Sequence, residues 1–578
     1  MLNRILVVGL LAGVAMPSFA VPFHVHDVRE VCHLPRTGNN GKVNGHDNGS
    51  SVLYNGTAYW FFADTLLDLN NDGIFTEIPP DGFSGLGTVA MTTDLNAADC
   101  MQMTYRASGG VAQGIWPISA RKSDECLLWP AGAVVANNQI YLYASGVKKN
   151  AQGACVLGNP SESFLSTINP TTLEGTRVVT IGAPGVPHFN QPFNVSEPSG
   201  CGGQIKWVYL IGTKGLDPPG TLFGRTGYLM ARVTEANIAT PAQYQYWNGS
   251  TWVVNDPNAA APLFEEVWGA NAAAVAYNQF LGRYLMIYTC DLTGGVCGRT
   301  ANVAGTGPAA LVGGWSERVV MYHCPGNFFH CYAAYQHAEY GNGSTLYLTT
   351  ARLTPVGESC TTHTDCHCPD DPNPVNQCVN GRCTTSIYDR YDLRLREVSI
   401  ASTPPPAGQV LADAGRDYSP KARCSAPVQG LNGWSYKRLS GSTLTDLNYS
   451  YLWHWRGPDS VAGFPAPAMN EDTAFPGTNT DAVRVWQAPS AGTAEISGEI
   501  RKRYTCGDDT IAEIIRIQNN TPVATLWSAT LNGVNRSALY NISVSVAAGD
   551  SLGFKVKRGG ALANCDEIFF APTINFVP

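Results

Sequence analysis

Runs in which apolar and polar residues alternate recur between Val43 and Ile400, and each leads through a turn signal into an aromatic-rich run. Period-two alternation predicts strands with one buried face, and Gly or Asn between two such runs predicts a hairpin. Repeated small antiparallel sheets around a channel are typical of a β-propeller. We therefore predict a five-bladed β-propeller over residues 21–401, with two stacked β-sandwiches as the alternative. The five units lie at residues 45–65, 133–143, 205–211, 274–288 and 344–353.

A Pro-rich stretch at residues 402–408 predicts a stiff, extended linker. Beyond it, further alternating runs include 494–500, 511–517, 540–546 and 551–556. These predict a C-terminal β-sandwich with jelly-roll topology over residues 409–578. In strand pattern alone, this part resembles the carbohydrate-binding modules that are appended to secreted polysaccharide-degrading enzymes. Its tryptophans could form a binding face or pack in the core.

The composition supports an all-β chain. Charged residues make up 14% of the sequence, whereas there are 60 Gly, 37 Pro and 25 Tyr, which favours turns and aromatic strands over long helices. The formal net charge is −8 and no basic patch stands out, so the sequence lacks the footprint of a nucleic-acid-binding protein. An uncharged, polyol-like partner such as a polysaccharide fits this composition better.

The N-terminal sequence has the features of a secretory signal peptide. Arg4 precedes an apolar run at residues 5–16, and Ser18-Phe19-Ala20 provides a small-x-small cleavage signature. We predict a signal peptide at residues 1–20 and a secreted protein, extracellular or periplasmic. No later segment is apolar for long enough to span a membrane.

The 17 cysteines of an exported chain favour disulfides over metal ligands. Cys290 with Cys297, and Cys324 with Cys331, are close enough in sequence to staple loops. A Cys-rich segment at residues 357–385 could be a disulfide knot or a zinc site, and its spacing lacks two clean CxxC pairs. Because residues 391–398 again read as a strand, we predict that this segment is an insertion in the last blade.

Two aspartates are predicted to face each other across the first hairpin. Asn55-Gly56 predicts a type I′ turn, which places Tyr54 opposite Thr57 and, counting outward, Asp47 opposite Asp64. Two directly opposed carboxylates destabilise a sheet, so their presence suggests a functional requirement. Glycosidases use a pair of carboxylates for catalysis. We predict that Asp47 and Asp64 are catalytic, the alternative being a turn cap or a structural ion site. The backbone register leaves open whether the mechanism is retaining or inverting.

At this hairpin the chain resembles the five-bladed propeller family called domain of unknown function 4185, which includes glycoside hydrolase family 183, the endo-D-arabinanases. The matching segments are Gly45-His46-Asp47-Asn48-Gly49 and Phe62-Ala63-Asp64-Thr65, and the likeness covers roughly residues 43–400. The chain departs from the pattern at His46 and Ala63, where the family tends to have Thr and Gly. The resemblance implies hydrolysis of furanosyl linkages in an arabinan, with Asp47 and Asp64 in the carboxylate roles.

Other residues are candidates for substrate binding. Glu197 and Glu266 could each supply a third acid, as related propeller glycosidases use three, or could be solvated loop carboxylates. His337 could bind a sugar hydroxyl at the channel mouth or be a structural histidine. Trp129 and Trp268 could stack on sugar rings, although buried packing is the default role of Trp.

The segment from Asp68 to Gly73 looks like the first half of a calcium loop, with oxygen ligands from Asp68, Asn70 and Asp72. An EF-hand is excluded because Pro79 stands where its last ligand, Glu, belongs. Structural calcium and a simple Asx-rich turn both remain open, and a paired-carboxylate mechanism requires no cofactor.

Together these features predict a secreted glycoside hydrolase that acts on an arabinan-type polysaccharide. The alternative is a non-catalytic glycan-binding propeller or adhesin.

Overall fold

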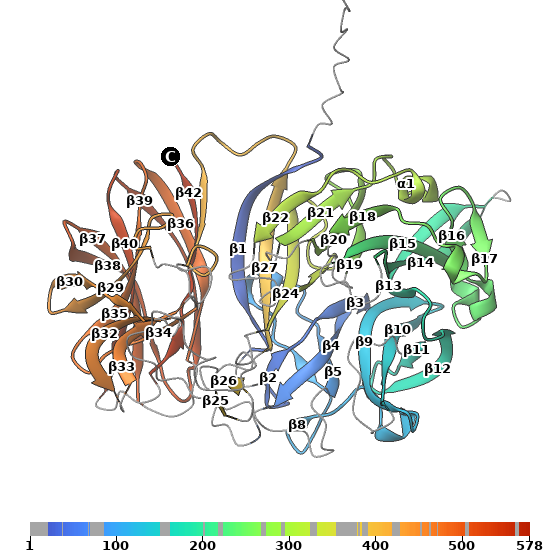
Figure 1. Ribbon diagram of the computed structural model, residues 1–578, viewed down its shortest axis with the longest axis horizontal. Coiled ribbons are helices and arrows are strands. Elements are labelled where there is room, and N and C mark those ends of the chain that lie inside the picture. The colour runs from blue at the N-terminus through green and yellow to red at the C-terminus, as the bar shows by residue number, and fades with distance from the viewer. Residues whose placement is uncertain are drawn as a thin grey trace, which may run out of the picture.

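A computed structural model gives the fold of the chain (Figure 1). The structure describes residues 21–36, 39–67, 69, 86–150, 162–199, 203–217, 224–267, 273–290, 295–323, 332–353, 378–379, 382–383, 391–418, 428–450, 454–461, 464–470, 472–502, 508–560 and 566–578. The predicted signal peptide and most of the Cys-rich insertion lie outside these residues. No helix in the described part of the chain is long and apolar enough to cross a membrane.

The predicted propeller is confirmed: in the described residues between His24 and Ala401, five antiparallel sheets form its blades. Blade 1 contains β2 (Val43–His46), β3 (Ser50–Tyr54), β4 (Thr57–Leu67), β5 (Leu86–Thr92) and β6 (Thr104–Tyr105). Blade 2 contains β9 (Glu125–Ala136), β10 (Gln139–Lys148), β11 (Glu162–Ile168) and β12 (Gly175–Gly182). Blade 3 contains β13 (His188–Pro198), β14 (Gln204–Gly215), β15 (Arg225–Thr234), β16 (Gln245–Trp247), β17 (Trp252–Val254) and β18 (Phe264–Val267). Blade 4 contains β19 (Ala273–Asn278), β20 (Arg283–Thr289), β21 (Gly295–Thr300) and β22 (Val319–His323).

Blade 5 is built from both ends of the propeller sequence. It contains β23 (Tyr332–Gln336), β24 (Thr345–Leu353), β27 (Tyr391–Ala401) and the N-terminal strand β1 (His24–Leu34), in the order β1-β27-β24-β23. The sequence pattern predicts β27 in this blade but does not reveal β1. Charged residues interrupt the apolar pattern of β1, and its pairing with β27 has two register shifts.

Short elements complete the propeller. They are β7 (Ala107–Ser108), β8 (Val111–Ala112), β25 (Cys378–Val379), β26 (Arg382–Cys383), α1 (Pro308–Val312) and the 3₁₀ turns Ala97–Asp99, Ile118–Ala120, Glu235–Asn237, Pro241–Gln243 and Pro257–Ala259. A disulfide between Cys32 and Cys100 ties β1 to blade 1. The predicted Cys290–Cys297 disulfide is confirmed, and Cys126 is also disulfide-bonded. Cys324 and Cys331 lie outside the described residues. These disulfides are typical of an oxidising compartment.

Glycines of blades 1 and 2 allow the next blade to pack closely against them. A Cβ atom at Gly87 would lie 2.9 Å from Pro130 Cδ of β9. At Gly132 it would lie 2.5 Å from Pro192 Cδ of β13. Each glycine therefore lets the next blade approach at a distance that a side chain would prevent.

The C-terminal part is a β-sandwich of two sheets in the residues described after Val410. One sheet contains β28 (Val410–Asp413), β31 (Asn448–Ser450), β32 (His454–Val461), β33 (Phe464–Met469), β34 (Thr473–Phe475), β36 (Gly492–Lys502), β39 (Ser537–Val546), β41 (Ile568–Phe569) and β42 (Thr573–Val577). The other contains β29 (Trp434–Ser440), β30 (Thr443–Asp446), β35 (Asp481–Gln487), β37 (Thr510–Gln518), β38 (Thr521–Leu531) and β40 (Ser551–Arg558). Trp434, Trp455 and Trp486 are buried in one core cluster, so packing explains them.

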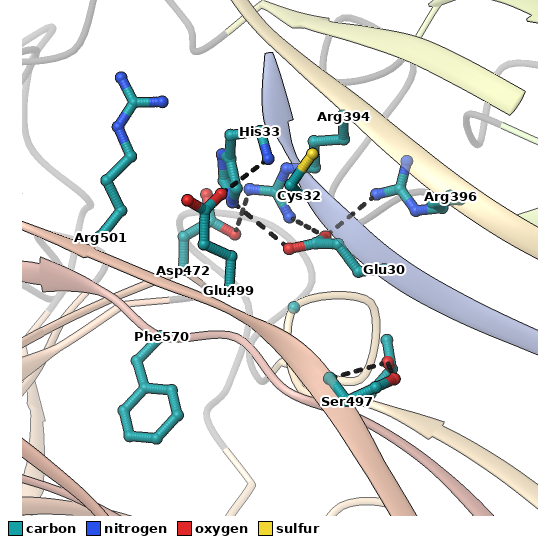
Figure 2. A network of polar contacts seen from close by, with 12 residues as sticks. Glu30, Cys32, His33, Arg394, Arg396, Asp472, Ser497, Glu499, Arg501 and Phe570 are labelled. Atoms are coloured by element: carbon teal, nitrogen blue, oxygen red, sulfur yellow. Dashed lines mark hydrogen bonds and ion pairs between the residues drawn. The ribbon is translucent and has the colours of Figure 1, made fainter. Parts of the chain in front are cut away.

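A buried ionic network joins the propeller to the sandwich (Figure 2). Glu30 of β1 accepts a hydrogen bond from Arg394 at 3.0 Å and lies 3.6 Å from Arg396. Arg394 also pairs with Asp472 of the sandwich at 3.3 Å, and the His33 N–H donates to Glu499 of β36 at 2.8 Å. Burial would raise the pKa of Glu30, but the charge of Arg394, a hydrogen bond from the His33 side chain and the charge of Arg396 lower it to about 2. The two parts therefore meet through charges that need each other as partners.

We expect Arg394→Leu to lower the stability of the intact chain by roughly 3–5 kcal/mol, because it removes the cation shared by Glu30 and Asp472. The midpoint of thermal unfolding measures the effect. The matched control is Arg225→Ala, since Arg225 is exposed and pairs with Asp217 and Glu265 at the surface. An equal shift of the midpoint in both variants would contradict a special role for the buried network.

Candidate active site

The hairpin of blade 1 has the predicted register. Tyr54 pairs with Thr57, Ser50 with Phe61 and His46 with Thr65. Between these pairs the Asp47 N–H donates to the Asp64 carbonyl at 2.8 Å, and the Ala63 N–H donates to the Asp47 carbonyl at 2.9 Å. The predicted opposition of Asp47 and Asp64 is therefore confirmed for the backbone.

Two local irregularities lie at this point of the hairpin. Asn48 has φ +56°, in the left-handed region, and its Oδ1 accepts a hydrogen bond from the Gly49 N–H at 2.8 Å. On the other side of β4, its pairing with β5 shifts register between Phe62 and Asp64. Bulges and left-handed residues re-aim side chains and are common beside active sites.

Asp47 lies in surroundings that oppose its negative charge. The residue is half-buried, and its Oδ1 is buried with no hydrogen-bond partner in the described part of the chain. Burial, and then the charge of Asp64, raise the pKa of Asp47 to about 7, against a hydrogen bond from the Tyr332 side chain that lowers it. Asp47 can therefore carry a proton near neutral pH.

Asp64 receives a strong donor from the next blade. The Trp129 indole Nε1 of β9 donates to Asp64 Oδ1 at 2.8 Å, and Trp129 is half-buried. The close packing of Pro130 over Gly87 brings this part of β9 against blade 1. A donor to a carboxylate favours its ionised form. The two aspartates thus lie where blades 5, 1 and 2 meet, and each receives a hydrogen bond from a neighbouring blade.

His46, one residue before Asp47, belongs to the core of blade 1. Its Nε2 and Nδ1 make hydrogen bonds with Tyr105 at 2.7 Å and Thr65 at 3.1 Å. Its ring stacks on Phe62 with centroids 3.7 Å apart. Burial lowers the pKa of His46 well below its usual value, so the ring is neutral. The His46 ring is therefore part of the packing behind the aspartates.

Comparison with known families identifies the chain. Residues 35–355, more than half of the sequence, match the family described as a domain of unknown function, DUF4185. The chain belongs to this family. The matched segment includes both aspartates and all of blades 1 to 4. A comparison with curated proteins finds no match for this DUF4185 chain.

Solved structures offer distant likenesses. An exo-beta-1,3-galactanase from Phanerochaete chrysosporium, with beta-1,3-galactotriose, shares 10% identity, with 95% of this chain and 100% of that chain covered and a TM-score of 0.38. A family 117 glycoside hydrolase from Zobellia galactanivorans shares 12% identity, with 65% and 91% covered and a TM-score of 0.35. We assign no activity to the DUF4185 chain from likenesses at this distance.

Glu266 does not fit the role of a third acid in this DUF4185 protein. It is buried, and its carboxylate accepts hydrogen bonds from Tyr288 and Arg299, both at 2.6 Å, and from Arg318 at 3.0 Å. Two guanidinium groups pair with this buried carboxylate between blades 3 and 4. Glu266 therefore contributes to packing between blades.

Glu197 lies in blade 3, whereas His337 packs against the blade 1 hairpin that carries the two aspartates. Glu197 is next to the last residue of β13, where it accepts a hydrogen bond from Tyr209 at 3.1 Å and pairs with Arg232 at 3.5 Å. His337 is fully buried, and its two ring nitrogens bond to Ser51 at 2.6 Å and to Thr349 at 2.8 Å. The predicted sugar contact of His337 does not fit this placement because no ring nitrogen faces solvent.

The remaining predicted residues lie outside the described residues. These are Trp268 and the candidate calcium ligands Asp68, Asn70 and Asp72. In the described part of the chain, no group of three or more His, Cys, Asp or Glu residues is arranged to hold a metal ion.

Sequence reasoning missed Tyr332, the donor to Asp47. It begins β23, far from Asp47 in sequence, and only the closure of the ring brings blade 5 beside blade 1. The aromatic pattern of blade 5 marks a strand at this point but gives no sign of a partner.

We expect Asp47→Asn to stabilise the fold at pH 8 by on the order of 1–3 kcal/mol, allowing for the solvent that reaches this half-buried residue. The folded-state pKa of about 7 lies above the unfolded value of 3.8. The wild type therefore loses this stability as the pH rises from about 4 to 7. Unfolding in denaturant at pH 4 and pH 8 measures the difference.

The gain should be small at pH 4, because Asp47 is protonated in the folded state and this pH is close to the unfolded pKa of 3.8, so ionisation of the unfolded chain has cost little stability. A variant that is less stable than the wild type at pH 8 would show that the Asp47 carboxylate is not under electrostatic strain.

Proposed function

We propose that this protein is a secreted glycoside hydrolase that cleaves furanosyl linkages within an arabinan-type polysaccharide, with Asp47 and Asp64 as its paired carboxylates. The observation that carries the proposal is the pair itself. Two opposed aspartates share one hairpin, and their surroundings favour opposite protonation states. Pairs of titratable groups whose environments differ in this way supply the acid and its ionised partner in glycosidases.

The surroundings assign a role to each residue. Asp47, partly protonated near pH 7, would donate its proton to the glycosidic oxygen as the bond to the anomeric carbon breaks. Asp64, held by the Trp129 N–H, would act as the ionised carboxylate. It would either attack the anomeric carbon or take a proton from the attacking water, according to whether the mechanism is retaining or inverting.

Trp129 would then have two functions. Its N–H orients Asp64, and the exposed part of its ring lies beside the aspartates, where a sugar ring could stack. The net charge of −8 favours a neutral glycan over an acidic one. The arabinan-type substrate rests on the resemblance of the hairpin motif to the endo-D-arabinanases. Secretion rests on the signal-peptide pattern and agrees with the disulfides.

We expect Asp47→Asn and Asp64→Asn each to lower the release of reducing sugar from D-arabinan or L-arabinan by roughly 10²–10⁴-fold, because each removes one partner of the acid–base pair. Asp99→Asn is the matched control, since Asp99 is an exposed aspartate beside blade 1. Undiminished sugar release by both site variants would exclude this site.

Binding of a polysaccharide without release of sugar would point to a different function. If the wild type retains arabinans and other neutral polysaccharides but releases no sugar from any of them, the protein is a glycan-binding propeller and the hydrolase proposal fails.

We expect Trp129→Phe to shift the acidic limb of the pH–rate profile to higher pH by about one unit, because loss of the N–H donor disfavours ionised Asp64. The alkaline limb, which Asp47 sets near pH 7, should stay in place. The retained aromatic ring should leave KM nearly unchanged. The rate of sugar release between pH 4 and 9 measures both limbs.

Trp247→Phe is the control, because Trp247 is a half-buried tryptophan of β16 in blade 3. An unmoved acidic limb combined with a raised KM in Trp129→Phe would mean that Trp129 binds substrate without orienting Asp64.

A further inference from the structure

A polar cavity of about 320 Å³ lies between the propeller and the sandwich. Its propeller wall comes from β1 and β27, and its sandwich wall comes from β36, β39 and β42. It is separate from Asp47 and Asp64, and no residue of the proposed catalytic site lines it. Ligand sites occur preferentially at domain interfaces, and this volume lies at the lower end of their range.

The sandwich wall is one face of three neighbouring strands. In the register of these strands, Glu495 is opposite both Ser543 and Asn575, and Ser497 is opposite both Asn541 and Thr573. The alternate positions of β36, such as Ala494 and Ile496, point into the hydrophobic core. This face therefore presents five amide or hydroxyl side chains and one carboxylate to the propeller.

The propeller wall carries charge. Arg29 donates to Glu397 at 2.6 Å, and Tyr347 donates to the same carboxylate at 2.8 Å, so Arg29 and Glu397 satisfy each other. Asp27 lies near Glu495 of the sandwich, and burial together with Glu495 raises the pKa of Asp27 to about 6. Three carboxylates and one guanidinium leave the cavity negative.

The chemistry of these walls restricts the ligand. An anion would meet carboxylates without a free cation, and Val28 and Ile542 alone offer too little apolar surface for an apolar ligand. In the part of the chain that the structure describes, no acidic or His/Cys cluster is arranged for a metal ion. Amides and hydroxyls donate to and accept from hydroxyl groups, and carboxylates accept from them. These are the partners that a sugar requires.

We propose that this interdomain cavity binds one or two sugar residues of a neutral glycan. Its ligand would contact both the propeller and the sandwich, so binding would hold a polysaccharide against the protein at a distance from the aspartates. The site requires the docked arrangement that the Glu30 network maintains, because neither wall encloses it alone.

Calorimetric titration of the full chain in the Asp47→Asn background, with arabinotriose, xylotriose and galactotriose as probes, tests the cavity without turnover. Asn541→Ala and Ser543→Ala, both at exposed positions of β39, should each weaken one binding event at least tenfold. Ser545→Ala, on the same face of β39 but outside the cavity, should leave it unchanged.

Three results would overturn the proposal: no binding of any probe, equal affinities in the lining and control variants, or binding of spermidine or Ca²⁺ in place of sugars. The measurement reports binding alone. A chain that releases no sugar could therefore still have this site, and an active hydrolase could lack it.

Discussion

The pairing of β1 with β27 is the interaction on which the arrangement of this protein depends. It completes blade 5 with a strand from the start of the chain and so closes the ring of blades. The pairing covers the edge of β27, which would otherwise be free to pair with other chains. It also places β23, with Tyr332, beside blade 1 and Asp47. The closed ring of blades therefore also completes the surroundings of Asp47.

The strand that closes the ring also carries the contact with the sandwich. Glu30 of β1 pairs with Arg394 of β27, which in turn pairs with Asp472 of the sandwich, and the backbone N–H of His33 donates to Glu499 of the sandwich (Figure 2). The disulfide from Cys32 ties the same strand to blade 1. Burying these charges costs several kcal/mol unless each keeps its partners, so a displaced sandwich would leave charges unpaired. The network thus favours one arrangement of the propeller and the sandwich. This arrangement determines the shape of the polar cavity between them.

The arrangement of the two aspartates costs stability. Their close opposition and the burial of Asp47 oppose its ionisation. An uncharged amide at position 47 would avoid the cost of burying a negative charge beside Asp64. The fold nevertheless holds them in place through hydrogen bonds from two neighbouring blades, of which Trp129 supplies one. Strained ionisable pairs of this kind are a recurrent feature of catalytic sites.

The sequence by itself determined the strands, the five blades and the register of the first hairpin, because alternation and the Asn55-Gly56 turn act between near neighbours. The linear pattern also placed Asp47 opposite Asp64. Only the tertiary structure decided that β1 closes the ring, that Tyr332 and Trp129 serve the aspartates, and that Glu266 and His337 are structural. These outcomes depend on contacts between residues far apart in the chain. Burial and the charges of neighbouring blades set them, and neither can be read from a local pattern.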